Sequence, residues 1–184
     1  MDYKDNLYYW DVEVDNLDFL NGITIQVAPL DWNGRMGKLK IYKVWEFDDA
    51  IEMFKQFFSD YYFFDEWSFI PVGYNLRFDF SVARKYAAKL GNEYSPWVYW
   101  SRPHIDLHHF TIVENKGFKG SSLANFSPKV GNGKYVGDYY KDGELEKIID
   151  YVTQEAEAFS QVFKHYVEAL EKNPNPWKNN GVRR

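Results

Sequence analysis

The chain has 184 residues, 45% of them hydrophobic and 27% charged, and a formal net charge of −5. These values predict one soluble globular domain. They exclude a disordered chain and a membrane protein, because no uncharged apolar run reaches about 18 residues. The chain has no cysteine, which excludes thiol catalysis, thiolate metal sites and disulfides. The polar residues 1–5 lack the apolar core of a signal peptide, so an intracellular, cytoplasmic protein is expected. The negative charge argues against a broad basic surface for nucleic acid, but not against phosphate chemistry mediated by bound cations.

The first half of the chain has the patterns of three strands and one helix. Aromatic and β-branched residues predict strands at residues 7–14, 22–28 and 38–47. Short turns separate these strands, the second of them at residues 31–35, so an antiparallel meander is expected. Asp48 and Asp49 are favourable capping residues, and a helix is predicted from residue 50 to about residue 62.

The second half alternates short apolar runs with helical patterns. It predicts strands at 68–73 and 104–109, helices at 78–90 and 144–171, and a short helix near Leu123. The last helix is the clearest element, because apolar residues recur along it at helical spacing: Leu145, Ile148, Val152, Phe159, Phe163, Tyr166 and Leu170. Residues 173–184 are expected to form a mobile C-terminal tail. The order of elements predicts an α/β fold with a mixed, five-stranded sheet flanked by helices, in one domain over residues 1–172.

Two acids interrupt the first predicted strand. Residues two apart in a strand share a face, so Asp11 and Glu13 project together while Trp10, Val12 and Val14 occupy the other face. In a central strand two neighbouring carboxylates are costly unless a cation compensates their charge. The alternative is an edge strand with a solvated acidic face, and both interpretations fit these residues.

Two more acids stand out by position. On a helical wheel Glu155 lies about 20° from Ile148, on the edge of the apolar stripe, and Tyr151 lies one turn earlier on the same flank. A structural Glu paired with Lys or Arg is the alternative. Asp79 follows the fourth predicted strand, where a position near a helix N-terminus would also explain it. Four acids from distant segments offer the hard oxygen ligands that suit two Mg²⁺ or Mn²⁺ ions: Asp11, Glu13, Asp79 and Glu155.

These motifs resemble those of the DEDD family of 3′-to-5′ exonucleases, which have the ribonuclease H-like fold. The most similar branch is the proofreading exonuclease domain of family B DNA polymerases. Asp11-Val12-Glu13 resembles the first motif, Asp-x-Glu. Gly73-Tyr74-Asn75 with Phe78-Asp79 resembles the second motif, and Tyr151-Val152-Thr153-Gln154-Glu155 resembles the third, Tyr-x-x-x-Asp. The likeness extends over nearly the whole chain, since it includes Ile105-Asp106-Leu107 and Gly133-Lys134.

The resemblance implies an enzyme that removes nucleotides from single-stranded or frayed 3′ ends by two-metal-ion phosphodiester hydrolysis, with DNA favoured over RNA. Asp11, Glu13, Asp79 and Glu155 would hold two divalent cations, Mg²⁺ or Mn²⁺, and Tyr151 would orient the attacking water. Asn75 and Phe78 would contact the 3′-terminal nucleotide. A replication or repair protein is a candidate partner. Candidate phosphate contacts are Arg77, Lys116, Lys119, Lys129 and Lys134.

One position departs from the family, which has Asp where this chain has Glu155. The longer side chain moves the ligand atoms, so the alternative is a catalytically impaired nucleic-acid-binding or scaffold protein that retains the fold. A carbohydrate-binding module would use the 20% of aromatic residues but would not need four clustered acids. His104, His108 and His109 are interpreted as structural or surface residues, because no carboxylate motif surrounds them.

Overall fold

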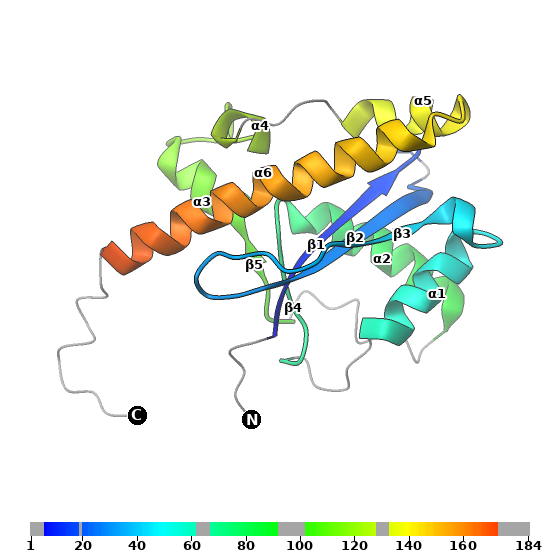
Figure 1. Cartoon of the computed structure of the whole chain (residues 1–184), viewed down its shortest axis with the longest axis horizontal. Helices are drawn as coiled ribbons and strands as arrows, with labels where there is room; N and C mark the ends of the chain where they lie inside the picture. The colour runs from blue at the N-terminus through cyan, green and yellow to red at the C-terminus, as the bar shows by residue number, and fades with distance from the viewer. Residues whose placement is uncertain (1–5, 19, 62–66, 92–101, 128–132, 173–184) are drawn as a thin grey trace.

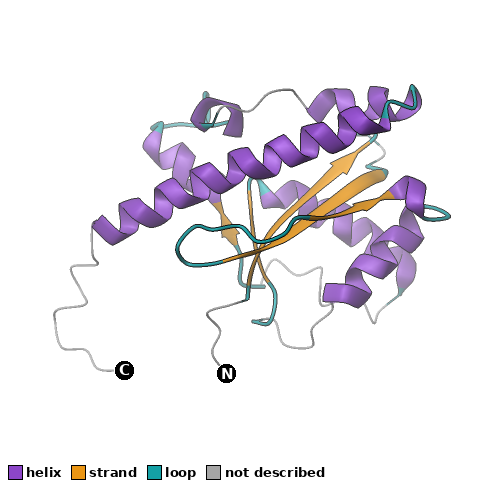
Figure 2. Cartoon of the chain, viewed as in Figure 1, coloured by secondary structure: helices purple, strands orange, loops and turns teal. Residues whose placement is uncertain are grey.

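The computed structural model describes residues 6–18, 20–61, 67–91, 102–127 and 133–172. Its centre is a mixed sheet of five strands in the order β3-β2-β1-β4-β5 (Figures 1 and 2). The strands are β1 (Leu7–Val14), β2 (Gly22–Leu30), β3 (Lys40–Lys43), β4 (Ile70–Gly73) and β5 (Ile105–Asp106). β1, β2 and β3 pair antiparallel, whereas β4 runs parallel to both β1 and β5. The predicted α/β class, the meander and the mixed strand directions are confirmed.

Helices cover both faces of this sheet. They are α1 (Ala50–Tyr61), α2 (Leu76–Leu90), α3 (Leu107–Glu114), α4 (Leu123–Phe126), α5 (Val136–Lys141) and α6 (Leu145–Lys172), with 3₁₀ turns η2 (Val44–Glu46) and η4 (Gly133–Tyr135). In Figure 1, α1 and α2 lie behind the sheet, and α6 crosses in front of it. Within the described ranges, no helix is long and apolar enough to cross a membrane.

The alternation of side chains along β1 separates two cores. Trp10 and Val12 pack with α1 and α2, where the Trp10 indole stacks on Phe57 at a centroid distance of 6.1 Å. Tyr9 points to the opposite face and meets Phe159 of α6 with ring centroids 4.7 Å apart. β1 is the central strand of the sheet, so the alternative of an edge strand is wrong for the strand as a whole, although beyond Tyr9 it pairs with β2 alone and Asp11 is half-buried.

The strand predicted at 38–47 is too long. Only Lys40–Lys43 pairs with β2, and the chain then makes the η2 turn, in which Phe47 N–H donates to the Val44 carbonyl at 3.1 Å. The chain must leave the sheet here to reach the face covered by α1. Asp49 caps that helix as predicted, because its Oδ1 accepts from Ile51 N at 2.7 Å and from Glu52 N at 2.9 Å.

The strand predicted at 104–109 is correct only at residues 105 and 106. β5 contains only Ile105 and Asp106, and helix α3 begins at Leu107. The Asp106 side chain is the reason, because it accepts a hydrogen bond from His108 N at 3.0 Å and so caps the helix. His104, which precedes β5, and His108, which lies in α3, therefore do not share a strand face.

Helix α6 follows the predicted apolar stripe over most of its length. Ile148, Val152 and Phe163 are buried, but Leu170 is 62% exposed, so the stripe continues past the core that it was expected to fill. The turn between β2 and β3 supports the middle of this helix. A Cβ atom at Gly34 would lie 2.6 Å from the Lys164 Cα, so the backbones are in close contact there.

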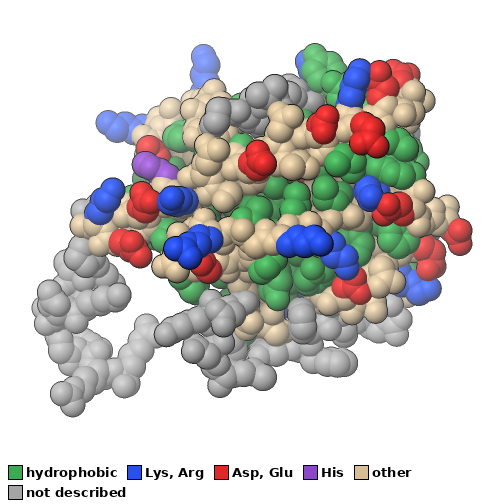
Figure 3. Space-filling view, viewed as in Figure 1, with side chains coloured by type: hydrophobic (Ala, Val, Ile, Leu, Met, Phe, Trp, Pro, Cys, Tyr) green, Lys and Arg blue, Asp and Glu red, His purple; other side chains and the backbone are tan. Residues whose placement is uncertain are grey.

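The surface carries both charges in mixed order. Figure 3 shows Lys and Arg beside Asp and Glu along α6 and the meander, without one continuous basic stripe on the face in view. This distribution agrees with the expectation from the net charge. The predicted mobile tail, 173–184, lies outside the described residues.

Candidate metal centre

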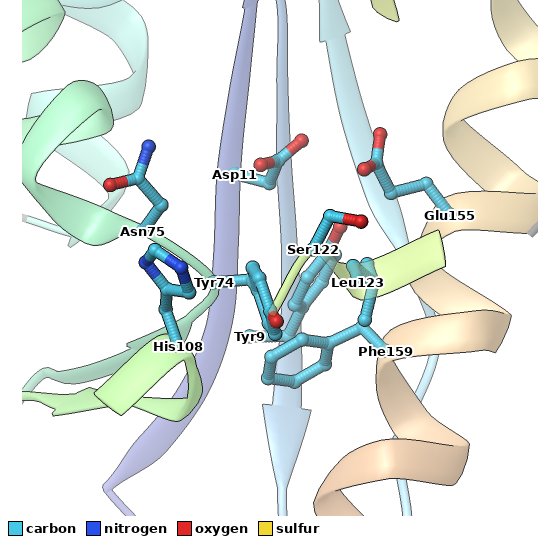
Figure 4. Close-up of a pocket in the computed structure, with 9 residues that line it drawn as sticks. All are labelled: Tyr9, Asp11, Tyr74, Asn75, His108, Ser122, Leu123, Glu155 and Phe159. Atoms are coloured by element: carbon cyan, nitrogen blue, oxygen red, sulfur yellow. The ribbon is translucent and has the colours of Figure 1, made fainter. Parts of the chain in front are cut away.

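Three carboxylates from distant parts of the sequence meet at the carboxyl end of β1. Asp11 and Glu13 lie on the face of β1 that is covered by α6, and Glu155 reaches them from that helix. One oxygen atom from each side chain can be chosen so that all three lie within 4.8 Å of one another. Figure 4 shows the Asp11 and Glu155 carboxylates beside each other, on opposite elements. The carboxyl ends of strands β1 and β4 are where α/β sheets commonly bind ligands.

Tyr151 belongs to the same cluster. Its side chain is buried, and its hydroxyl is hydrogen bonded to the Glu155 carboxylate one helical turn away. Burial raises the pKa of Tyr151 far above its usual value, and the negative charges of Glu13 and Glu155 raise it further. Tyr151 therefore keeps its proton over the working pH range of an enzyme and acts as a hydrogen-bond donor.

Gly133 lies against this cluster on the side of η4. A Cβ atom at this position would be 3.0 Å from the Tyr151 hydroxyl oxygen and 3.3 Å from Glu13 Oε2. The backbone of η4 is thus so close to Tyr151 and Glu13 that a Cβ atom at residue 133 would be in tight contact with both side chains. Gly133, the first residue of the Gly-Lys segment noted in the sequence, therefore lies against Tyr151 and Glu13.

Asp79 lies next to this group but is not one of the three acids that meet within 4.8 Å. It is buried, and its Oδ1 accepts a hydrogen bond from Val12 N at 2.8 Å, beyond the point where β1 pairs with β4. Burial raises the pKa of Asp79 well above its usual value, and the charge of Asp11 raises it further. The Asp79 carboxyl group thus bonds a backbone N–H of β1 beyond the pairing with β4, and it lies beside Asp11.

The turn between β4 and α2 places Asn75 at the mouth of the site. Asn75 adopts the left-handed conformation, with φ 62° and ψ 43°. Its N–H donates to Asp106 at 2.8 Å, and Leu76 N–H donates to the same carboxylate at 3.0 Å. Asp106 therefore caps two helices, and the Asn75 side chain is left to face the pocket (Figure 4). Gly73 is required just before this turn, because a Cβ there would lie 2.8 Å from the Trp10 carbonyl oxygen.

A pocket of about 350 Å³ opens beside the carboxylates. Its walls combine two of the acids with aromatic and small polar side chains: Tyr9, Asp11, Tyr74, Asn75, His108, Ser122, Leu123, Glu155 and Phe159 (Figure 4). The sequence analysis named four of these residues as part of the site or its motifs, namely Asp11, Tyr74, Asn75 and Glu155. Tyr9 and Phe159 could have been found from the strand and helix periods, because they lie two residues before Asp11 and four after Glu155. His108, Ser122 and Leu123 carry no local signal.

The remaining candidate residues lie elsewhere. Phe78 packs against the core on the α1 and α2 face and does not line the pocket. The cationic candidates are exposed, namely Arg77, Lys116, Lys119 and Lys134, and Lys129 lies outside the described residues. The His104 ring packs edge-on against Phe80, and its Nδ1 is 2.8 Å from the Arg102 carbonyl, which agrees with a structural role.

Gln26 on β2 supports Asp11 from the side. It is fully buried and lies opposite Asp11 in the β1–β2 register. The amide orientation that satisfies both of its ends places the nitrogen 3.0 Å from Asp11 Oδ2 and the oxygen 2.7 Å from the Thr24 hydroxyl. A buried amide that donates to a carboxylate fixes its orientation, as the outer partners of metal ligands do.

The donor set fits a hard divalent cation. Three carboxylates supply only oxygen ligands, which Mg²⁺ and Mn²⁺ prefer, and within the described residues the group contains no histidine. An ion at this position would also offset the repulsion among the acids. Comparisons of the sequence with known protein families and with curated proteins give no match.

Proposed function

We propose that this chain is a metal-dependent 3′-to-5′ exonuclease with the ribonuclease H-like fold, related to the DEDD exonucleases. It removes nucleotides from single-stranded or frayed 3′ ends, with DNA favoured over RNA. The observation that carries the proposal is the meeting of Asp11, Glu13 and Glu155 within 4.8 Å beside a pocket of about 350 Å³. A pocket of this size lies near the lower end of the range for small-molecule sites, which suits one nucleotide.

The arrangement of the motifs supports this proposal. The residues that resemble the three exonuclease motifs come from β1, the β4–α2 turn with the first turn of α2, and α6. Residues of β1, of the β4–α2 turn and of α6 line the pocket. The β1–β2–β3 antiparallel meander, with the parallel strands β4 and β5 on the other side of β1, is compatible with the ribonuclease H-like fold that the resemblance implies. An acidic surface without a function does not usually carry aromatic rings and an asparagine in the left-handed conformation around the same pocket.

Each residue has a chemical task in the proposed reaction. Divalent cations, when bound, lower the pKa of the attacking water and stabilise the leaving 3′ oxygen. Asp11, Glu13 and Glu155 would hold the cations, and Gln26 keeps the Asp11 carboxylate oriented. The Tyr151 hydroxyl donates its proton to Glu155, so its oxygen positions the water by accepting a hydrogen bond from it. The apolar walls of the pocket take up a base that has left its stack, which requires a frayed or single-stranded end.

The glutamate at the last motif position is compatible with an active site. Although its side chain is one methylene longer than aspartate, the Glu155 carboxylate comes within ligand-sharing distance of Asp11 and Glu13. Its hydrogen bond with Tyr151 fixes it on the flank of α6. These contacts favour the nuclease over the alternative of an impaired nucleic-acid-binding or scaffold protein.

The test follows a 5′-labelled single-stranded DNA and its RNA counterpart on a sequencing gel with Mg²⁺, Mn²⁺ or EDTA. The expected result is a metal-dependent ladder that shortens from the 3′ end and is lost in Asp11→Ala. Asp150→Ala is the matched control, because Asp150 is exposed on α6 and should leave the ladder unchanged. If a folded wild-type protein binds the strand but leaves it intact with both metals, the nuclease proposal is refuted and the alternative of a nucleic-acid-binding protein takes its place.

A further inference from the structure

His108 is part of the pocket, although the sequence suggested a structural or surface residue. It lies in the first turn of α3, whose cap at Asp106 turns the chain away from the sheet. Its ring lines the opening on the wall opposite Glu155 and Phe159 (Figure 4). The segment from Asp106 to His108 thus delivers an aromatic, polar side chain to the same space as the carboxylates.

The hydrogen bonds of Ser121 fix both the orientation and the tautomer of this ring. The Ser121 hydroxyl donates its only proton to the Phe118 carbonyl at 2.7 Å. The contact of 2.9 Å between Ser121 Oγ and His108 Nε2 must then be a bond in which the imidazole N–H donates. The ring is therefore held in one rotational position before any ligand arrives.

Tyr74 holds the ring from a second direction. The Tyr74 and His108 rings pack with centroids 5.2 Å apart at an angle of 34°. The Tyr74 hydroxyl is 2.7 Å from the Thr111 hydroxyl, and it also donates to the Ser121 carbonyl, so both rings are tied to α3 and to the loop that follows it. The result is a preorganised aromatic surface across the pocket from α6. Preorganised groups lose little entropy when they bind a ligand.

We propose that His108 is a substrate-positioning residue, whose ring supports the base of the terminal nucleotide while the carboxylates face its phosphate. This inference rests on the proposed function. It assigns the ring surface, not a proton transfer, to His108, because Nε2 is engaged by Ser121. Stacking of this kind tolerates every base, since each base has a flat face.

The adjacent histidine provides a matched control. His109 is exposed and lines a different groove, between α3 and α6, with Phe110 and Tyr166. Replacing His109 removes the same chemical group from the same helix without touching the pocket. An effect that is specific to His108 must therefore come from its position.

The test measures binding and turnover in His108→Ala, His108→Phe and His109→Ala. Binding of a fluorescent single-stranded oligonucleotide is followed by anisotropy with Ca²⁺ in place of Mg²⁺, on strands shown to be intact by gel. His108→Ala is expected to raise Kd and KM about tenfold, near the low end of the effect of losing one stacked base, with kcat within about twofold of wild type. His108→Phe keeps a ring and should stay within about threefold of wild type. His109→Ala should have no effect.

Three results would overturn the inference. A folded His108→Ala protein with wild-type Kd and KM would show that the ring makes no contact. Equal losses in His108→Ala and His108→Phe would exclude stacking, and equal losses in the His109 control would exclude a local effect. If His108→Ala does not fold, His108→Leu replaces it as the variant without a ring. A wild-type protein that neither binds nor cleaves would refute the proposed function itself, and the inference with it.

Discussion

Replacing Gly133 with alanine would add one methyl group between the Tyr151 hydroxyl and the Glu13 carboxylate. The added Cβ would lie 3.0 Å from the Tyr151 oxygen, whereas ordinary contacts begin at 3.4 Å, so the difference of about 0.4 Å must be absorbed by movement. The Tyr151 ring is buried on a long helix and cannot swing aside freely. A misplacement of 1 Å can cost a factor of about 100 in rate, so a shift of 0.4 Å corresponds to about a sixfold loss of kcat.

The assay is steady-state cleavage of a 5′-labelled DNA strand, with thermal unfolding as the check of folding. Gly117→Ala is the control, because a Cβ at Gly117 meets no atom within 4 Å and its backbone needs no left-handed conformation. We expect Gly133→Ala to lower kcat with little change in KM, and Gly117→Ala to match wild type. Full activity in a folded Gly133→Ala protein would refute the idea that η4 confines Tyr151 and Glu13.

Three further predictions concern Glu155, Gln26 and Asp60. Glu155→Gln removes a ligand charge, so it should weaken Mn²⁺ binding by more than tenfold in calorimetry, whereas Asp150→Asn should leave it unchanged; equal affinities would remove Glu155 from the site. Gln26→Leu removes the donor to Asp11 and should weaken the same binding about 10–100-fold without global unfolding, a result that unchanged affinity would contradict. Asp60→Asn should lower the stability at pH 7 by about 1 kcal/mol, measured by urea unfolding, because Asp60 is hydrogen bonded on α1 yet partly exposed. Burial raises the pKa of Asp60, but its hydrogen bonds with Lys40, Tyr42 and Gln56 lower it more, so the net shift is downward. The stability that Asp60 contributes is therefore present above the unfolded-state pKa and is lost as the pH falls through the folded-state pKa. An Asn variant that is still less stable than wild type in strong acid would contradict this.

The parts of the fold that periodicity specifies were predictable. The alternation in β1 and the apolar stripe of α6 each reflect burial against a neighbouring layer, which leaves a direct record in the sequence. The lengths of β3 and β5 were not predictable in the same way. Asp106 ends β5 because its carboxylate meets backbone N–H groups from two helices, and one of those helices begins at Leu76, 30 residues earlier. Such a cap depends on tertiary contacts that no local pattern contains.

The residues of the candidate site likewise divide into those that a local pattern predicts and those that depend on tertiary contacts. Asp11 and Glu13 could be named because they interrupt an apolar strand, and Glu155 because it lies on the edge of the apolar stripe of α6. Asp79 was expected as the fourth ligand, but it is not one of the three acids that meet within 4.8 Å. It instead accepts a hydrogen bond from Val12 N–H, a contact that depends on the tertiary structure. The pocket residues of α3 and α4, such as His108, could not be found, since they follow irregular chain whose path depends on the folded protein.

The close contact between Gly34 and Lys164 determines how the Glu155 carboxylate can be displaced. Lys164 is nine residues beyond Glu155, or about 13.5 Å along α6. Nearer to Glu155, the Phe159 ring packs on Tyr9 of the central strand, so the helix is held against the sheet at two separate points. Lengthening the β2–β3 turn by one residue would change the position of α6 on the sheet. It would thereby move Glu155 relative to Asp11, even though the turn lies outside the pocket. Insertions at this turn are therefore expected to disturb the proposed metal site, whereas similar insertions at a surface turn that contacts no helix are not.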